Sequence, residues 1–365
     1  MSLLARYAEH LFWLARYTER ASSLSRIIET HAAYDRGREA ETSWAWLVKL
    51  YADDALFAAR NEEASARNVL HFYIRDLNHP GSILSTIRFA RENARTLRAV
   101  LPTEMWVHIN EFYNRLMVMG EREIEPINLS RTCGTIRAGA NAQLGIATST
   151  LYRDEGWRFY ELGAMIERAD QTSRLLDVKF AQLATMSGAS EERDLTDTSH
   201  WALVLRSAAA YQAFHRHEAC RIEPNRIAAF LTINASHPRA AAYCVLEMER
   251  VVNELRRRYK LGRTSRALER LDELHGALAE FESRSDLVGV LHQFNDGLQR
   301  RLNALSEEIG TAFFGHGETT PVVPSIPAEA ASPAAPKSTQ AAADQAAAPA
   351  PAETKPPRPK ARQKS

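Results

Sequence analysis

The sequence predicts an all-α protein, an internally duplicated helical bundle with a disordered C-terminal tail. Three observations support this prediction. Apolar residues recur at three- and four-residue spacing up to Phe314, and no convincing strand interrupts them. One helical stretch, residues 157–177, has a relative 148 positions earlier in the chain. From Gly315 onward Pro, Ala, Ser and Lys dominate, so few bulky apolar side chains are left to bury.

The repeat is plainest around a Glu-Arg-Ala tripeptide. Glu167-Arg168-Ala169 aligns with Glu19-Arg20-Ala21 at an offset of 148, and His237-Pro238 aligns with His79-Pro80 at an offset of 158. One loop insertion, which we place at Gly188 to Asp197, accounts for the change in offset. We therefore expect a first helical repeat over 1–150, a second over 151–314 that packs with it as one compact unit, and a disordered tail over 315–365.

The sequence of the first half predicts a series of helices. Residues 3–33 form one long helix because no Gly or Pro interrupts the apolar positions. Thr42-Ser43 caps a second helix that runs through Leu56, and a third helix begins at Asn61. Ser82 caps a helix over 83–100, and Pro102 starts the next one. After a linker over 120–130 comes a helix over 131–152, in which small residues indicate close backbone approach to a neighbour: Gly134, Ala138, Gly139, Ala142 and Gly145.

The sequence of the second half predicts helices in the same order as in the first half. The helix that contains residues 157–177 corresponds to the long helix at the start of the chain. Helices over 239–259, 265–282 and 286–314 follow, each with apolar residues at three- and four-residue spacing. The two copies of the long helix are expected to pack against each other or to occupy equivalent places.

Charge and composition exclude several classes of protein. The 46 Lys and Arg residues balance 45 Asp and Glu residues, so no global field attracts nucleic acid or an anionic membrane. The first residues show no secretory signal, and no run of about 18 apolar residues predicts a membrane span. Three widely spaced cysteines, Cys133, Cys220 and Cys244, form neither a metal knuckle nor a disulfide framework. A cytoplasmic location is expected.

The repeated motif places acidic and basic side chains together. Residues seven apart return to one face of a helix, so Glu19 lies with Arg26 and Glu167 lies with Arg174. Two such helices side by side could form a quartet in which the Glu of one meets the Arg of the other, which would fix the register between the halves. Alternatively, the pairs are solvated and contribute at most about 1 kcal/mol each.

A functional pocket is the other interpretation of the motif. Four arginines would then grip an anionic ligand: Arg20, Arg26, Arg168 and Arg174. Glu19 and Glu167 are the weak catalytic candidates, because a carboxylate beside Arg has a lowered pKa and is a poor general acid. Asp170 follows the second Glu-Arg pair and belongs to the same candidate set.

Other chemistry finds little support in the sequence. No phosphate-binding loop or dinucleotide fingerprint is present, so no cofactor is expected. The paired Glu-x-x-His motifs of di-metal bundles are missing, so no metal is expected either. The last residues are basic at Lys355, Arg358, Lys360, Arg362 and Lys364. They predict a solvated end or a salt-dependent tether to a polyanion, without the aromatic residues that stack on nucleic-acid bases.

Several stretches resemble one family. Residues 1–21, Asn78 to Ile83, Glu167 to Asp170 and His237-Pro238-Arg239 are similar to the alpha-E family of bacterial helical proteins, named for a Glu-Arg motif. The resemblance covers residues 1–312. It departs from the family at Ser22, where an acidic residue is common, and at Ser236-His237, where an aromatic residue is usual before Pro.

The resemblance implies genomic context more than chemistry. Alpha-E proteins are encoded beside, or fused to, circularly permuted ATP-grasp proteins, often with a transglutaminase-like peptidase nearby. By this analogy the chain would be the accessory or substrate-presenting partner of a peptide or amide ligase. One alternative is a helical-bundle enzyme in which Glu19 or Glu167 transfers protons in a pocket. A third interpretation is polyanion binding through the basic tail.

Overall fold

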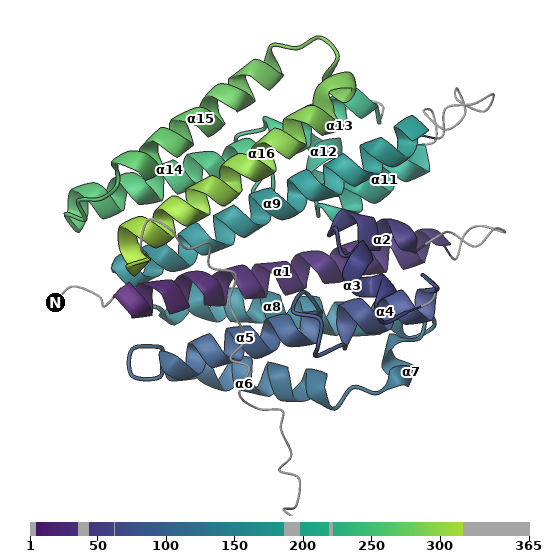
Figure 1. Cartoon of the computed structure of the whole chain (residues 1–365), viewed down its shortest axis with the longest axis horizontal. Coiled ribbons are helices and arrows are strands. Elements are labelled where there is room, and N and C mark those ends of the chain that lie inside the picture. The colour runs from purple at the N-terminus through teal and green to yellow at the C-terminus, as the bar shows by residue number, and fades with distance from the viewer. Residues whose placement is uncertain (1–4, 36–43, 62, 186–197, 219–221, 317–365) are drawn as a thin grey trace, which may run out of the picture. The chain divides into compact units, whose positions relative to one another are not determined.

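The computed structural model describes residues 5–35, 44–61, 63–185, 198–218 and 222–316 (Figure 1). These residues belong to one compact unit, and every regular element among them is a helix. The predicted all-α class is therefore confirmed. The predictions for the tail beyond residue 316, for the loop insertion at Gly188 to Asp197 and for Cys220 lie outside the described residues.

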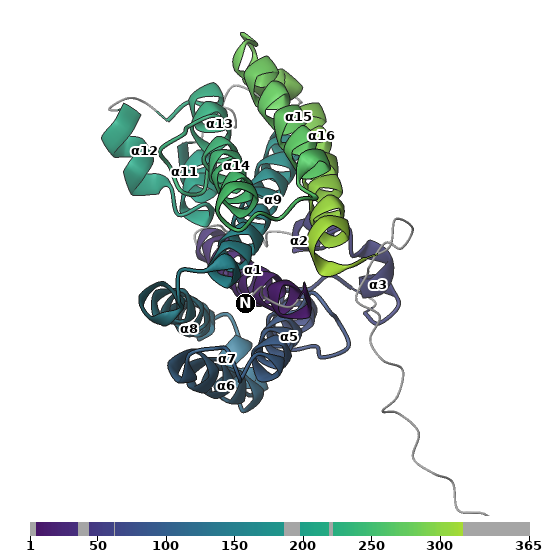
Figure 2. The ribbon, with the colours of Figure 1, turned by 90° about the vertical axis from the view of Figure 1, so that its left-hand side faces the viewer.

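Two long helices lie side by side at the centre of this unit (Figures 1 and 2). They are α1, Ala5–Asp35, and α9, Glu155–Thr185. At their crossing the two backbones nearly touch, because a Cβ atom added to Gly163 would lie 2.2 Å from the carbonyl oxygen of Phe12. The absence of a side chain at Gly163 is what permits this approach.

Three further helices pack on each side of the central pair (Figure 2). The set beside α1 consists of α5 (Ile83–Thr96), α6 (Thr103–Met117) and α8 (Leu129–Thr150). The set beside α9 consists of α14 (Ala241–Arg258), α15 (Ser265–Glu282) and α16 (Leu287–Ile309), which the π-helix η1 (Gly310–Phe314) extends. In the first set α5 and α8 contact α1, and in the second α14 and α16 contact α9, while α6 and α15 pack against the other helices of their own set. Phe12 of α1 belongs to the core on the α9 side, so the two cores meet at the crossing.

Short helices complete each half. In the first half they are α2 (Ala45–Leu50), α3 (Asp54–Ala58), α4 (Ala66–Ile74) and α7 (Glu121–Ile124). In the second half they are α11 (Thr198–Ser207), α12 (Tyr211–Glu218) and α13 (Pro224–Thr232). Short helices of each half also contact the long helix of the other half, since α2 contacts α9 and α11 contacts α1.

The predicted second helix is broken where the backbone turns left-handed. Ala52, between α2 and α3, has a φ of 55°, and so has Ala209, which lies 157 positions later between α11 and α12. A left-handed residue ends an α-helix, so a single helix through Leu56 was a wrong prediction. The internal duplication stays a prediction, and this shared break and the common order of helices support it.

Local signals for helix starts were partly correct. The Ser82 hydroxyl accepts a hydrogen bond from the Ser85 amide at 3.1 Å, which confirms the predicted cap. The helix expected at Asn61 instead begins at Ala66, because Ser65 is the residue whose side chain caps it. The expected linker over 120–130 contains α7 and the first turn of α8.

The small residues of α8 have unequal roles. A Cβ atom on Gly139 would lie 2.5 Å from the Phe112 ring, so close approach is confirmed there. Nothing lies within 4 Å of such an atom at Gly134 or Gly145, and for these two glycines the prediction was wrong. Composition alone does not distinguish a glycine at a contact from one that faces open space.

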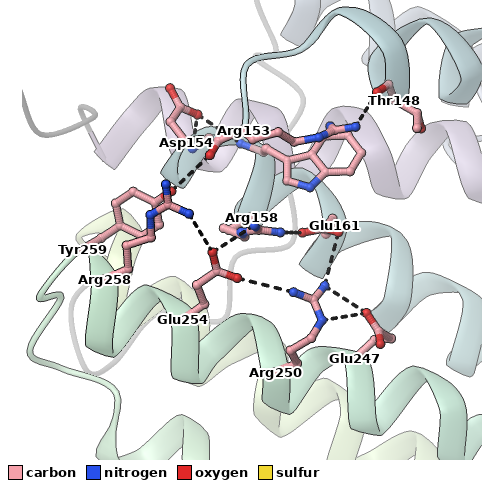
Figure 3. A network of polar contacts seen from close by, with 12 residues as sticks. Thr148, Arg153, Asp154, Arg158, Glu161, Glu247, Arg250, Glu254, Arg258 and Tyr259 are labelled. Atoms are coloured by element: carbon pink, nitrogen blue, oxygen red, sulfur yellow. Dashed lines mark hydrogen bonds and ion pairs between the residues drawn. The ribbon is translucent and has the colours of Figure 1, made fainter.

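An ion-pair network joins α9 to α14 near the start of α9 (Figure 3). Glu254 of α14 lies 2.9 Å from Arg158 of α9, and Arg250 of α14 lies 3.3 Å from Glu161 of α9. Arg250 also pairs with Glu247 on its own helix at 2.9 Å. These side chains are partly exposed, so each pair contributes at most about 1 kcal/mol.

Candidate functional site

The carboxylate of Glu167 lies in the interface between the two long helices. Its side chain is 0% exposed. Arg16 of α1 donates from Nε at 3.1 Å, and Arg20 donates from Nε at 2.6 Å and from Nη2 at 3.0 Å. Two guanidinium groups from α1 therefore neutralise one buried carboxylate of α9, and charge-assisted hydrogen bonds of this kind are the strong ones.

The carboxylate of Glu19 is bound in the opposite sense. Arg168 of α9 donates from Nη2 to Glu19 at 3.0 Å, and Nη2 of Arg239, just before α14, lies 2.8 Å from the other carboxylate oxygen. Each motif Glu thus faces the motif Arg of the other long helix. We call the six side chains of these ion pairs the Glu-Arg clamp: Arg16, Glu19, Arg20, Glu167, Arg168 and Arg239.

The pairing across the helices matches the predicted quartet in type but uses other arginines. Residue numbers rise together along both helices at their contacts, from Phe12 with Gly163 to Arg20 with Glu167. Arg26 and Arg174 therefore lie about two turns beyond the carboxylates expected to receive them. Arg174 pairs instead with Asp170 of its own helix at 2.8 Å.

Polar side chains extend the clamp toward α2. Gln171 donates to Glu167 at 3.1 Å, and its amide oxygen accepts from the Tyr51 hydroxyl at 2.8 Å. Tyr73 donates to Asp53 at 2.9 Å a short distance away. The sequence did not single out Tyr51, Tyr73 or Asp53, because no fixed spacing relates them to the motif. The only available signal was Gln171, which lies one turn after Glu167.

Electrostatics hold both motif carboxylates in the ionised form. Burial alone would raise the pKa of Glu19, but Arg239 and Arg168 outweigh it and lower the pKa to about 2. Burial is likewise outweighed at Glu167, where Arg20 and Arg16 lower the pKa to about 2. Such carboxylates carry no proton to donate near neutral pH, and each forms ion pairs with two arginines. These properties favour structural ion pairs, and they make each carboxylate a poor general acid and a weak base.

Two buried histidines occupy corresponding places in the halves. The His79 ring stacks on Phe72 with centroids 4.0 Å apart, and the His237 ring lies 5.1 Å from that of Phe230. Burial lowers the pKa of each histidine to about 4. Both imidazoles are therefore neutral at physiological pH and contribute as core aromatic groups.

We expect the stability of the protein to fall in two steps on acidification. The unfolded chain binds protons at His79 and His237 between about pH 6.5 and 4 while the folded state does not, so stability falls there. Glu19 and Glu167 bind protons in the unfolded chain from about pH 4.5, and their contribution is lost as the pH falls to about 2. Urea midpoints measured from pH 7 to pH 3 test both steps. A variant with His79→Phe and His237→Phe should lose only the upper step, and an unchanged upper step would contradict this assignment.

Other candidate chemistry is sparse in the described part of the chain. Cys133 and Cys244 are buried, and burial raises the pKa of each thiol to about 12, which leaves no reactive thiolate. Across residues 5–316, apart from the gaps named above, no three His, Cys, Asp or Glu side chains gather as metal ligands. No helix in the same residues has the length and apolar character of a membrane span.

The fold and the clamp define a class, an all-helical protein whose two long central helices are joined by reciprocal Glu-Arg ion pairs. The chain belongs to the alpha-E family, described as a predicted alpha-helical domain with a conserved ER motif, whose model matches residues 3–314. The Glu-Arg pairs of the clamp, Glu19-Arg20 and Glu167-Arg168, both lie within that match. The resemblance noted in the sequence is thereby confirmed.

Curated relatives come from mycobacteria. The chain is 22% identical over 297 residues to the uncharacterized protein Mb2597 of Mycobacterium bovis, which covers 75% of this chain and 32% of the relative. It is 21% identical over 297 residues to the uncharacterized protein Rv2567 of Mycobacterium tuberculosis, with the same coverage. The matched region thus spans about a third of the length of these relatives. No solved structure matches the chain.

Proposed function

We propose that this protein is a non-catalytic interaction partner, in which the Glu-Arg clamp makes one rigid body of two helical halves for a ligase of the circularly permuted ATP-grasp type. The observation that carries the non-catalytic part is the clamp itself. Both motif carboxylates are buried, paired with arginines and ionised, so the motif is occupied in holding helices together. Each motif carboxylate is therefore already paired with two arginines.

The ligase partnership rests on the family. The chain is an alpha-E protein. The expectation that such proteins are encoded beside, or fused to, circularly permuted ATP-grasp proteins motivates the choice of partner. The curated relatives are about three times as long as the region matched, so in them this region is part of a larger protein. In this proposal the chain presents substrate or product to the ligase in the cytoplasm, and a transglutaminase-like protein is a second partner.

Affinity purification of the tagged full chain from its own host at moderate salt tests the partnership. We expect an ATP-grasp ligase to be identified by mass spectrometry with the full chain and also with a chain that ends at His316. The shorter chain keeps the residues of the compact unit that the structure describes. If only the full chain retains the ligase, the ligase binds to the basic tail and not to the helical unit.

A reconstitution separates the accessory role from catalysis. The purified ligase should hydrolyse ATP or form product faster when the chain is added, whereas the chain alone should form no product. Turnover by the chain alone, abolished by Glu167→Gln in a variant that still folds, would overturn the non-catalytic assignment and favour the enzyme interpretation. Failure of any ligase to co-purify or to respond would overturn the partnership and leave the clamp as a structural feature.

A further inference from the structure

Among the described residues, Arg26 differs from the other motif arginines in having no ion pair with a carboxylate. Arg20 pairs with Glu167, Arg168 with Glu19 and Arg174 with Asp170. The Nε atom of Arg26 is buried and has no hydrogen-bond partner. The residue as a whole is half-buried, so other atoms of its side chain are in contact with solvent.

Two further guanidinium groups bracket Arg26 on the same side of α1. Arg239 is fixed about one turn before it, by Ser23 at 3.3 Å and by Glu19 at 2.8 Å. Arg137 of α8 is fixed about one turn after it by an ion pair with Glu29. Glu19 and Glu29 are therefore already engaged by these neighbours, and the positive charges of Arg239 and Arg137 both act on Arg26.

The environment of Arg26 lowers the pKa of its guanidinium. Burial, together with the positive charges of Arg239 and Arg137, lowers the pKa of Arg26 to about 10, and Glu19 only partly opposes this. A buried N–H group without an acceptor is costly, and a bound anion would relieve both the missing hydrogen bond and the repulsion.

In the second half of the chain, the arginine that corresponds to Arg26 has a carboxylate beside it. At the offset of 148, Arg26 corresponds to Arg174 and Ser22 corresponds to Asp170. Asp170 accepts from Nε of Arg174 at 2.8 Å. Ser22 is too short and uncharged to do the same for Arg26, and its hydroxyl is buried without a partner. The first half therefore has the arginine and a free hydroxyl but lacks the carboxylate.

We propose that a free oxyanion, a carboxylate or a phosphate group, binds between Ser22 and Arg26 at the place that corresponds to the Asp170 carboxylate beside Arg174. It accepts hydrogen bonds from Ser22 Oγ and Arg26 Nε and is attracted by the flanking Arg137 and Arg239. This site does not depend on the ligase partnership, because it rests only on side chains of this chain. The anion is then a ligand of the Glu-Arg region of this chain, which has Ser22 at the position of the acid.

Thermal unfolding of the full chain at constant ionic strength tests the site. Sodium acetate, N-acetylglycine and sodium phosphate are titrated against sodium chloride, and we expect a saturable rise in the midpoint of roughly 2 °C or more. Arg26→Gln should abolish the rise. Ser22→Asp, which supplies the carboxylate within the chain, should raise the midpoint without added anion and abolish the further rise. Arg67→Gln is the control, because it removes an exposed guanidinium away from the site and should leave the response unchanged.

The arms of the titration distinguish the sources of the anion. A response to acetate and N-acetylglycine but not to phosphate assigns a carboxylate such as a peptide C-terminus, and N-acetylglycinamide should then be inactive. A response to phosphate alone assigns a phosphate group, and a response to both assigns a general oxyanion site. No saturable response to any of them, or an unchanged response in Arg26→Gln, would overturn the proposal.

Discussion

Glu167→Gln is expected to lower the free energy of unfolding by about 3–5 kcal/mol, because it leaves Arg16 and Arg20 without their shared carboxylate in a buried interface. The amide has nearly the same shape as the carboxylate, so the loss arises from charge and hydrogen bonding and not from a cavity. Urea denaturation at pH 7 measures it directly. The helical circular dichroism of the folded variant should be unchanged, because the other contacts of α9 remain.

A matched control uses the partly exposed ion-pair network that joins α9 to α14. Arg250→Gln also removes one charge from a group with several partners, but its side chain is 43% exposed, so we expect a loss of at most about 1 kcal/mol. Equal losses in the two variants would contradict the assignment of Glu167 to a buried clamp. A loss near zero for Glu167→Gln would indicate that water reaches the carboxylate.

Gly163→Ala is the second change with a large expected effect. The new methyl group would lie 2.2 Å from the Phe12 carbonyl oxygen, and this neighbour is backbone, which cannot rotate away as a side chain can. The two long helices must separate locally, and we expect a loss of about 1–3 kcal/mol or more. Thermal or urea unfolding gives the value.

Gly145→Ala in α8 is the control for helix propensity. Nothing lies within 4 Å of a Cβ atom at Gly145, so alanine should be neutral or should stabilise the protein by about 0.5–1 kcal/mol. If Gly163→Ala also stabilises the protein, the helices cross elsewhere and the positions assigned to the clamp are wrong.

The sequence could predict the class of fold because apolar periodicity and helix caps are local signals. Ser82 is an example, since its hydroxyl caps the helix that follows it directly in the chain. The break at Ala52 could not be predicted, because an alanine with a φ of 55° is imposed by packing and has no sequence signature.

The candidate site was predicted less completely for a geometric reason. Periodicity gives the face of a helix on which Glu19 lies, but it does not give the level at which a second helix crosses. The cross-helix pairing was therefore expected, while its partners, Arg20 and Arg168 instead of Arg174 and Arg26, were not. Arg239 was missed for a related reason, because it reaches Glu19 from a distant turn. The structural and the ligand-binding interpretation of the motif now apply to different residues. Three motif arginines pair with carboxylates, and Arg26 has no such partner among the described residues.

A double-mutant cycle across Arg20 and Glu167 tests most directly whether the Glu-Arg motif joins the two halves. Urea denaturation gives the free energy of unfolding for the wild type, Arg20→Gln, Glu167→Gln and the double variant. We expect a coupling energy within about 0.5–3 kcal/mol, as for residues in direct contact, with the double variant less destabilised than the sum of the single variants. Additive losses would contradict a reciprocal clamp between α1 and α9.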